Sequence, residues 1–117
     1  MKKIGLSLLL LLSVTTGYGQ RTYDEFFLEA MVQRQKGNND AAFDLLRHCL
    51  EINPEAPEAW YFLAQYFNAL KNTDKSLEYI KKAASLDPDN EIYMETLAQA
   101  YIRQQDYEAA IPVVEKI

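Results

Sequence analysis

His48 and Cys49 are the only histidine and the only cysteine of the chain, and they are neighbours in the sequence. A thiol beside an imidazole can act as an activated nucleophile when the two side chains are within hydrogen-bond reach. Neighbours on a helix, however, point about 100° apart and do not face each other. We therefore expect Cys49 to be a packed core residue and His48 an exposed one. A second histidine is missing, so we expect no metal site.

The acidic and aromatic residues also argue against catalysis. Seventeen Asp and Glu residues are spread over expected helix starts and outer faces, without a doublet suited to acid–base chemistry. The four glycines form no phosphate-binding loop. Eight tyrosines alternate with acids and amides, whereas nucleic-acid platforms combine aromatic residues with Lys and Arg. We predict no enzymatic activity, no cofactor and no nucleic-acid partner, and we leave glycan binding by the tyrosines as an open alternative.

The elements that carry these side chains recur with a period of 34 residues. The columns that repeat at this spacing include small residues, large apolar residues and an acid or amide before proline: Ala30, Ala64 and Ala98; Ala42, Ser76 and Ala110; Phe26, Trp60 and Met94; Leu46, Ile80 and Val114; Asn53-Pro54 and Asp87-Pro88. A fixed period of this length is typical of an array of stacked units and not of a globular enzyme.

Each unit is predicted to be a pair of antiparallel helices. Apolar residues at i, i+3, i+4 and i+7, as in Trp60, Leu63, Ala64 and Phe67, indicate the buried stripe of a helix. The expected helices cover about residues 23–36, 40–52, 58–70 and 107–117. Of the other two, one follows the cap Thr73 and ends at Asp87-Pro88, and the next opens after Asn90 and ends before Gln104. We expect turns at Gly37-Asn38-Asn39, Asn72-Thr73 and Gln104-Gln105-Asp106, with Thr22 and Thr73 as helix caps, Pro57 at a first helical position and Pro112 bending the last helix.

These columns resemble the tetratricopeptide repeat, with its pattern W-x2-L-[GA]-x2-[YF], then a small residue, an aliphatic residue, a second small residue and proline. The pattern is carried by Trp60, Leu63, Ala64, Phe67, Ser76, Ile80, Ala83 and Pro88 in the central unit, by Phe26, Ala30, Gly37, Ala42, Leu46, Cys49 and Pro54 in the first, and by Met94, Leu97, Ala98, Tyr101, Ala110 and Val114 in the third. The resemblance implies an all-α, right-handed solenoid of antiparallel helix pairs. Its repeats would span residues 23–56 and 57–90, with an incomplete repeat at 91–117.

The resemblance also implies a concave groove lined by the first helix of each pair, in which members of the family hold peptides or partner helices. Carried over by column, the groove residues are Phe27, Met31, Arg34, Tyr61, Gln65, Asn68, Glu95, Gln99 and Ile102. We expect Phe27, Met31 and Tyr61 to accept an apolar side chain of a partner. Gln65, Asn68 and Gln99 would bond its backbone. The alternative is that these residues only pack along neighbouring helices.

The amino-terminal residues 1–19 are predicted to be a signal peptide. Lys2 and Lys3 precede an apolar run of eleven residues, which is short of the roughly 20 that span a bilayer, and Gly17 and Gly19 favour cleavage before Gln20. No cysteine stands at the end of the apolar run, so we expect no lipid anchor. We expect an exported periplasmic or cell-envelope protein, and we keep an uncleaved anchor as an alternative. Cleavage would move the formal net charge from −5 to −7, because two lysines and no acid are removed, and this disfavours anionic partners.

The two flanks of the array differ in the sequence. Glu29 and Gln33 stand where later units have leucine and an aromatic residue, which suits an outer flank that meets water. Ile117 lies inside the last expected helix, and no capping signal follows it. We therefore predict a protein–protein interaction scaffold whose last helix associates with a second copy or a partner. The alternative is the leading segment of a longer exported protein with an enzymatic or signalling domain downstream.

Overall fold

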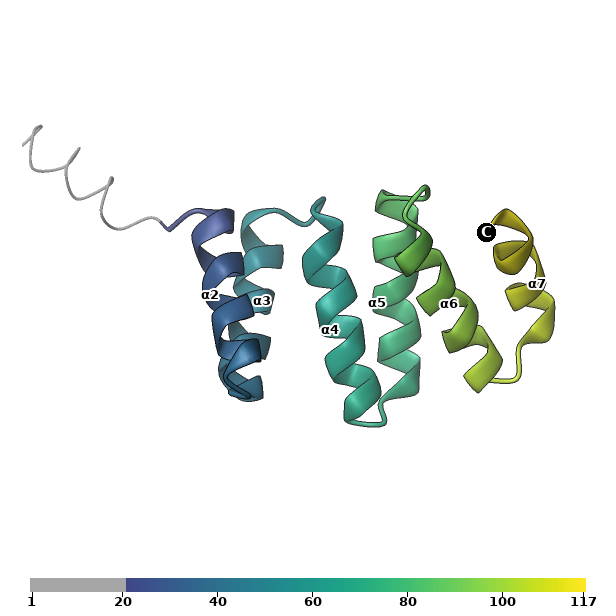
Figure 1. The fold of residues 1–117 in the computed structure, drawn as a ribbon, viewed down its shortest axis with the longest axis horizontal. Helices are drawn as coiled ribbons and strands as arrows, with labels where there is room; N and C mark the ends of the chain where they lie inside the picture. Colours follow the sequence, from purple (N-terminus) through teal and green to yellow (C-terminus); the bar gives the residue numbers. More distant parts are fainter. Residues whose placement is uncertain (1–20) are drawn as a thin grey trace, which may run out of the picture.

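The computed structural model describes residues 21–117, and over these residues it contains six α-helices and no strand. The helices are α2 (Tyr23–Gln35), α3 (Asn39–Ile52), α4 (Pro57–Ala69), α5 (Thr73–Leu86), α6 (Glu91–Arg103) and α7 (Tyr107–Lys116). They form three antiparallel pairs stacked in a row, with the three hairpin turns along one edge (Figure 1). The predicted all-α architecture is confirmed, whereas the predicted signal peptide at 1–19 lies outside the described residues.

Side chains cap most of the helix starts. The Thr22 hydroxyl accepts a hydrogen bond from the Glu25 backbone N–H at 3.2 Å, as predicted, and Pro57 is the first residue of α4. The prediction that Thr73 caps α5 is wrong, because Thr73 is the first helical residue. The Asn72 side-chain oxygen accepts from the Lys75 N–H at 3.3 Å and is the actual cap. Asn is among the strongest N-cap residues, so it replaces the neighbouring threonine in this role.

Each hairpin turn holds one residue in the left-handed region, and these three residues are spaced by the repeat period. The angle φ is 81° at Gly37, 63° at Lys71 and 60° at Gln105. The backbone N–H groups of Asn38, Asn72 and Asp106 each donate to the carbonyl five residues earlier at 2.9 Å, which is the bond of a Schellman helix ending. Only glycine adopts this conformation without steric cost, so the repeat geometry holds Lys71 and Gln105 there.

Two apolar clusters run through the stack and meet at α4 and α5. The first joins α2, α3 and α4 through Ala30, Leu46, Cys49, Ala59, Leu63 and Phe67. The second joins α4, α5 and α6 through Ala64, Ile80, Ala83, Ala84, Tyr93, Met94, Leu97 and Ala100. Tyr79 packs against both clusters, and the buried Ser76 hydroxyl donates to the Ala64 carbonyl at 2.8 Å. The core is therefore continuous along the array and has no single centre.

Trp60 is only half-buried, although it was predicted to belong to the buried stripe of its helix. Its ring packs edge-on against Tyr79, with centroids 5.1 Å apart. The indole N–H donates to the Pro54 carbonyl at 2.8 Å. The tryptophan thus ties the segment between α3 and α4 to α5, and it keeps its polar edge hydrogen-bonded, as a large aromatic residue in a partly exposed site requires.

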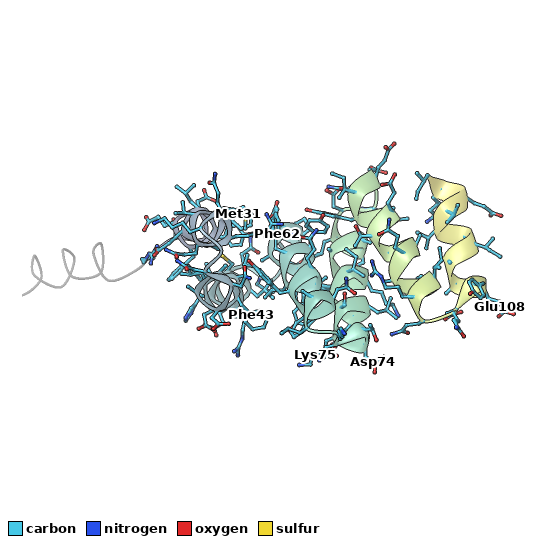
Figure 2. The ribbon with its side chains drawn as sticks, turned by 60° about the horizontal axis from the view of Figure 1, so that its bottom comes forward. Met31, Phe43, Phe62, Asp74, Lys75 and Glu108 are labelled. Carbon is cyan, nitrogen blue, oxygen red and sulfur yellow. The ribbon has the colours of Figure 1, made fainter. Side chains whose placement is uncertain are left out.

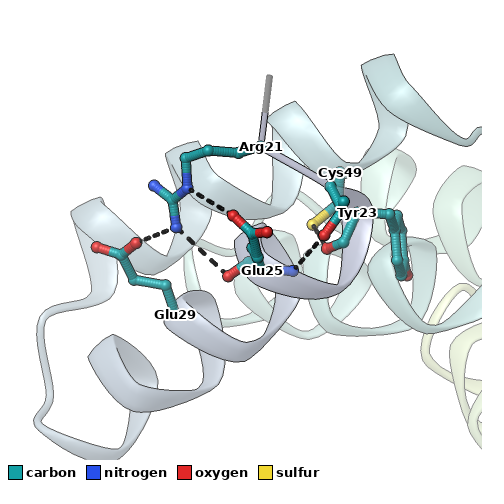
Figure 3. A network of polar contacts seen from close by, with 6 residues as sticks. Arg21, Tyr23, Glu25, Glu29 and Cys49 are labelled. Carbon is teal, nitrogen blue, oxygen red and sulfur yellow. Dashed lines mark hydrogen bonds and ion pairs between the residues drawn. The ribbon is translucent and has the colours of Figure 1, made fainter. Parts of the chain in front are cut away.

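Helix α2 carries a polar flank on its outer side. The Arg21 guanidinium forms ion pairs with Glu25, at 3.9 Å from Nε to the carboxylate, and with Glu29 (Figure 3). It also lies 4.4 Å from the centre of the Phe26 ring. Glu29 is half-buried by these contacts. On this flank Glu29 takes the place of Leu63 and Leu97 of the later units, and Arg21 pairs with it.

Helix α7 presents the opposite surface. Ala110 is its only buried residue, and the prediction that Val114 repeats the buried column of Leu46 and Ile80 is wrong, because Val114 is exposed with Ile111 and Ile117. In the described part of the chain no helix packs on this face of α7, whereas α4 and α6 cover the matching faces of α3 and α5. The helix continues past Pro112 to Lys116.

Candidate partner-binding groove

A hollow of about 410 Å³ lies between the first helices of the second and third pairs. Its lining comes from α4, α5 and α6: Tyr61, Ala64, Gln65 and Asn68; Ser76; and Thr96, Gln99 and Arg103. The structure therefore brings together four of the nine predicted groove residues, namely Tyr61, Gln65, Asn68 and Gln99. Two residues that were not predicted, Thr96 and Arg103, complete the same wall.

The Tyr61 side of the hollow is held in place by neighbouring rings. The Tyr61 ring lies 5.2 Å from Phe62 and 5.0 Å from Tyr93, measured between centroids. Its hydroxyl accepts a hydrogen bond from the Gln65 amide nitrogen at 2.6 Å, and the Gln65 amide oxygen accepts from Arg34 at 3.3 Å. Gln65 is therefore already hydrogen-bonded, and Tyr61 presents a fixed aromatic wall to the hollow.

Other lining residues of the hollow, on both α4 and α6, carry polar groups without partners. Within residues 21–117, the side chains of Asn68, Gln99 and Arg103 make no hydrogen bond or ion pair to another side chain or to the backbone. Each amide offers two N–H donors and a carbonyl acceptor, and the guanidinium offers five N–H donors. Three side chains with unused hydrogen-bonding capacity thus line one concave surface, and their chemistry matches the N–H and C=O groups of an extended peptide.

Arg34 links this hollow to a neighbouring one of about 420 Å³, which it lines with Asn39, Gln65, Tyr66 and Ala69. Its guanidinium carbon lies 4.9 Å from the centre of the Phe62 ring, in cation–π contact. The two hollows share Gln65, so the polar surface extends from α6 across α4 to the end of α2.

Phe27 and Met31 are half-buried and pack against the first apolar cluster. The Phe27 ring stacks on Tyr23, with centroids 5.8 Å apart and planes 9° apart, and lies 6.0 Å from Phe62. Such packing is what the alternative interpretation expected of them, and partner binding by these two residues stays a prediction. Glu95 and Ile102 are exposed on α6 but do not line the hollow.

Arg103 and Thr96 could have been found from helix spacing. Thr96 precedes Gln99 by three residues and Arg103 follows it by four, which places all three on one face of α6. Arg103 is also the only basic residue of α4 and α6. The sequence prediction used only the three groove columns of the tetratricopeptide repeat, and Thr96 and Arg103 lie outside these columns.

Cys49 and His48 occupy different environments. The Cys49 thiol is buried, lies 3.9 Å from the Tyr23 carbonyl (Figure 3), and has its pKa raised to about 11 by burial. His48 is exposed; its ring stacks on Phe26 at 5.4 Å and its Nδ1 lies 3.4 Å from Glu51. The thiol is therefore protonated at neutral pH and has no base beside it among the described side chains, so the residue contributes packing.

Over residues 21–117, no three His, Cys, Asp or Glu side chains cluster in a way that could hold a metal ion. None of helices α2 to α7 is long and apolar enough to cross a membrane.

Comparisons with known proteins agree with this architecture. Sequence models described as tetratricopeptide repeat match residues 33–93 and 93–117. No curated protein sequence matches significantly. A crystal structure of MamA superimposes with a TM-score of 0.73 at 19% identity, over 81% of this chain and 56% of that one. The Sgt2 TPR domain from Aspergillus fumigatus superimposes with a TM-score of 0.68 at 24% identity, over 80% and 62% of the two chains.

A third structure, MamA 41-end from Desulfovibrio magneticus RS-1, has a TM-score of 0.70 at 21% identity and covers 80% of this chain and 53% of that chain. The chain thus spans about half the length of the MamA structures that it matches. At these identities the likeness shows a shared fold. The first sequence model covers more than half of the 117 residues, and the chain therefore belongs to the tetratricopeptide repeat family.

Proposed function

We propose that this chain is a protein–protein interaction scaffold that binds an extended segment of a partner protein across α4 and α6. The observation that supports this function best is the convergence of Asn68, Gln99 and Arg103 on one hollow with their hydrogen-bonding groups unused. Backbone amides of an extended segment need such donors and acceptors when they leave water. The family membership supports the class of function, since stacked helical repeats build extended concave binding surfaces.

The partner segment is expected to lie with one apolar side chain against Tyr61 and its backbone along Asn68 and Gln99. Arg103 adds a fork of N–H donors that suits a carbonyl or carboxylate oxygen of the segment. Tyr61 is anchored by Phe62 and Tyr93, so it loses little freedom when it is covered. We place this binding outside the cytoplasm, in the periplasm or cell envelope, on the strength of the signal-peptide pattern in residues 1–19.

The test is capture of cell-envelope proteins by three immobilised forms of the chain. The first is the native chain, and the second carries Asn68→Ala, Gln99→Ala and Arg103→Ala. The third is a matched control with three exposed residues of α5 changed, Glu78→Ala, Lys81→Ala and Lys82→Ala. Losing about three hydrogen bonds of roughly 0.5–1.5 kcal/mol each predicts at least a tenfold drop in capture for the groove variant.

The control variant should capture the partner as the native chain does, and circular dichroism should show the same helix content for all three forms. Equal capture by the groove variant, or an equal loss in the α5 control, would contradict the proposal. Fractionating cells and locating the chain would test the envelope assignment separately from binding.

A second candidate keeps the groove and places it at the start of a longer exported protein whose downstream domain carries an enzymatic or signalling activity. It is supported by the finding that the chain spans about half the length of the MamA structures it matches. Reading the gene beyond the codon for Ile117 decides between the candidates. A continuing frame favours the longer protein, and a stop codon favours the short scaffold.

A further inference from the structure

A third hollow, of about 460 Å³, lies between α3 and α4 near their hairpin turns. Helix α3 contributes Asn39, Asp40, Phe43 and Asp44, and helix α4 with its C-cap contributes Tyr66, Ala69 and Leu70. Figure 2 places Phe43 along the lower edge of the array, away from Met31 and Phe62. This edge hollow adjoins the hollow of about 420 Å³ beside Arg34, with which it shares Asn39, Tyr66 and Ala69, and it has no lining residue in common with the hollow between α4 and α6.

The floor of this edge hollow is apolar and is held in place. The Phe43 ring packs edge-on against Phe67, at 5.4 Å between centroids, and against Tyr66 at 6.3 Å. The Tyr66 hydroxyl donates to the Asn39 side-chain oxygen at 3.4 Å and so has its polar end occupied. Leu70 forms the outer wall with 71% of its surface exposed, which makes it the most exposed large apolar residue among residues 21–117.

At the next junction a hydrogen bond joins the two helices that correspond to α3 and α4. One repeat period after Asp40 and Leu70 stand Asp74 and Gln104, and the Gln104 amide donates to the Asp74 carboxylate at 3.0 Å. At the first junction, Leu70 cannot make this bond, and Asp40 has no hydrogen bond or ion pair within the described part of the chain. The unbonded Asp40 carboxylate thus follows from Leu70, which stands where the next junction has Gln104.

The charge on the rim selects the occupant. Asp40 and Asp44 are exposed, lie one turn apart on the same face of α3, and repel each other in the absence of a cation. Asp44, like Asp40, has no ion pair or hydrogen bond from any described side chain. A ligand with an apolar group for Phe43 and Leu70 and a positive charge for the rim complements both features.

We propose that the edge hollow is a second docking site, which receives a large apolar side chain of a partner segment while an adjacent Lys or Arg of that segment pairs with Asp40 and Asp44. The proposal does not depend on the groove over α4 and α6. The groove presents Arg103 and amides, and the edge hollow presents carboxylates and aromatic rings, so the two surfaces select segments of opposite charge.

The experiment selects a random heptapeptide library, displayed on phage, against the full chain. Leu70→Gln serves as the discriminating variant, because it copies the residue that donates the hydrogen bond at the next junction. Leu28→Gln is the matched control, since Leu28 is 67% exposed and lies outside the hollow. We expect peptides with a large apolar residue next to Lys or Arg to be enriched on the native chain and on Leu28→Gln, and to bind Leu70→Gln at least tenfold more weakly.

An enriched peptide is then synthesised and titrated into the labelled chain by NMR. Saturable shifts should fall on residues 39–44 and 66–70, weaken with rising salt, and persist in the Asn68, Gln99 and Arg103 variant. Enrichment that survives Leu70→Gln, the absence of any enrichment, or shifts confined to α6 would overturn the proposal. Concentration-dependent shifts at 39–44 and 66–70 without peptide would assign the hollow to a second copy of the chain and would also overturn it.

Discussion

Helices α3 and α7 hold the same place in their pairs, yet the apolar face of α3 is buried and that of α7 is largely exposed. Leu46 and Val114 occupy equivalent positions two repeat periods apart and are 0% and 51% exposed. Leu46 packs in one cluster with Ala59 and Leu63 of α4, whereas none of the described helices covers the matching face of α7. The burial of a second helix is therefore supplied by the pair that follows it and only in part by its own partner.

This contrast extends to the binding surfaces. Both hollows lie on or beside α4, the helix that joins the two apolar clusters and that is packed on both sides. The apolar face of α7 is a third exposed surface, and its association with a second copy or a partner stays a prediction. Sites built on well-packed helices hold their side chains more rigidly than sites on a helix that lacks a neighbour.

The largest effect is expected from truncating the two equivalent residues. Leu46→Ala removes a fully buried side chain and leaves a cavity, so it should lower the free energy of unfolding by about 2–5 kcal/mol. Val114→Ala should lower it by less than about 0.5 kcal/mol, since exposed positions contribute little. Urea denaturation followed by circular dichroism measures both. Equal losses of unfolding free energy at the two positions would contradict the inference that the following pair of helices buries Leu46.

Alkaline pH should destabilise the first pair of helices, because two groups with a raised pKa, Tyr23 on α2 and Cys49 on α3, lie there. Burial raises the pKa of Cys49 to about 11, and burial and the hydrogen bond to Glu58 raise the pKa of Tyr23. Above pH 9 the unfolded chain releases these protons while the folded chain retains them. The unfolded state then binds fewer protons, and stability falls as pH rises.

For Cys49 the expected loss is on the order of 2 kcal/mol between pH 9 and pH 11. Urea denaturation over this pH range should give a steeper fall for the native chain than for Cys49→Ala, which lacks the thiol. Parallel curves for the two proteins would show that the thiol is not the source of the dependence.

The hairpin turns offer a smaller test of how the repeat geometry overrides residue preference. Lys71→Gly and Gln105→Gly should each raise the unfolding free energy by up to about 1 kcal/mol, because φ is positive at both residues. Gly37→Ala should lower it by about 1 kcal/mol through backbone strain alone, since a Cβ there would meet no atom within 4 Å. Thermal unfolding of the three variants measures these shifts, and a destabilised Lys71→Gly would contradict the assignment.

The sequence was sufficient for the helices and their pairing, because the 34-residue period ties each apolar column to one place in the stack. Ala30, Leu46 and Ala64 are all buried as their columns predict. It was less informative about Val114, because its exposure depends on the helix that would cover it and not on its own side chain. The left-handed Lys71 escaped prediction for a related reason: the turn is imposed by the packing of its pair, and lysine carries no signal for it.

The site was predicted in part. Tyr61, Gln65, Asn68 and Gln99 follow from the family columns, which hold because the first helices keep one face toward the groove. Arg103 lies outside those columns, and the unbonded Asp40 of the edge hollow follows from Leu70, which stands where the next unit has a glutamine. Such differences between equivalent residues become interpretable only when their three-dimensional neighbours are known.

The claim that the partner binds over α4 and α6 is tested most directly by comparing the groove with the exposed face of α7 in one experiment. A photoreactive amino acid is placed at Gln99 in one protein and at Val114 in another, since both side chains are exposed. After irradiation with the captured partner, we predict cross-links to the partner from position 99 and none from position 114. Cross-linking of the partner from position 114 alone would contradict the claim that the surface over α4 and α6 is the binding site.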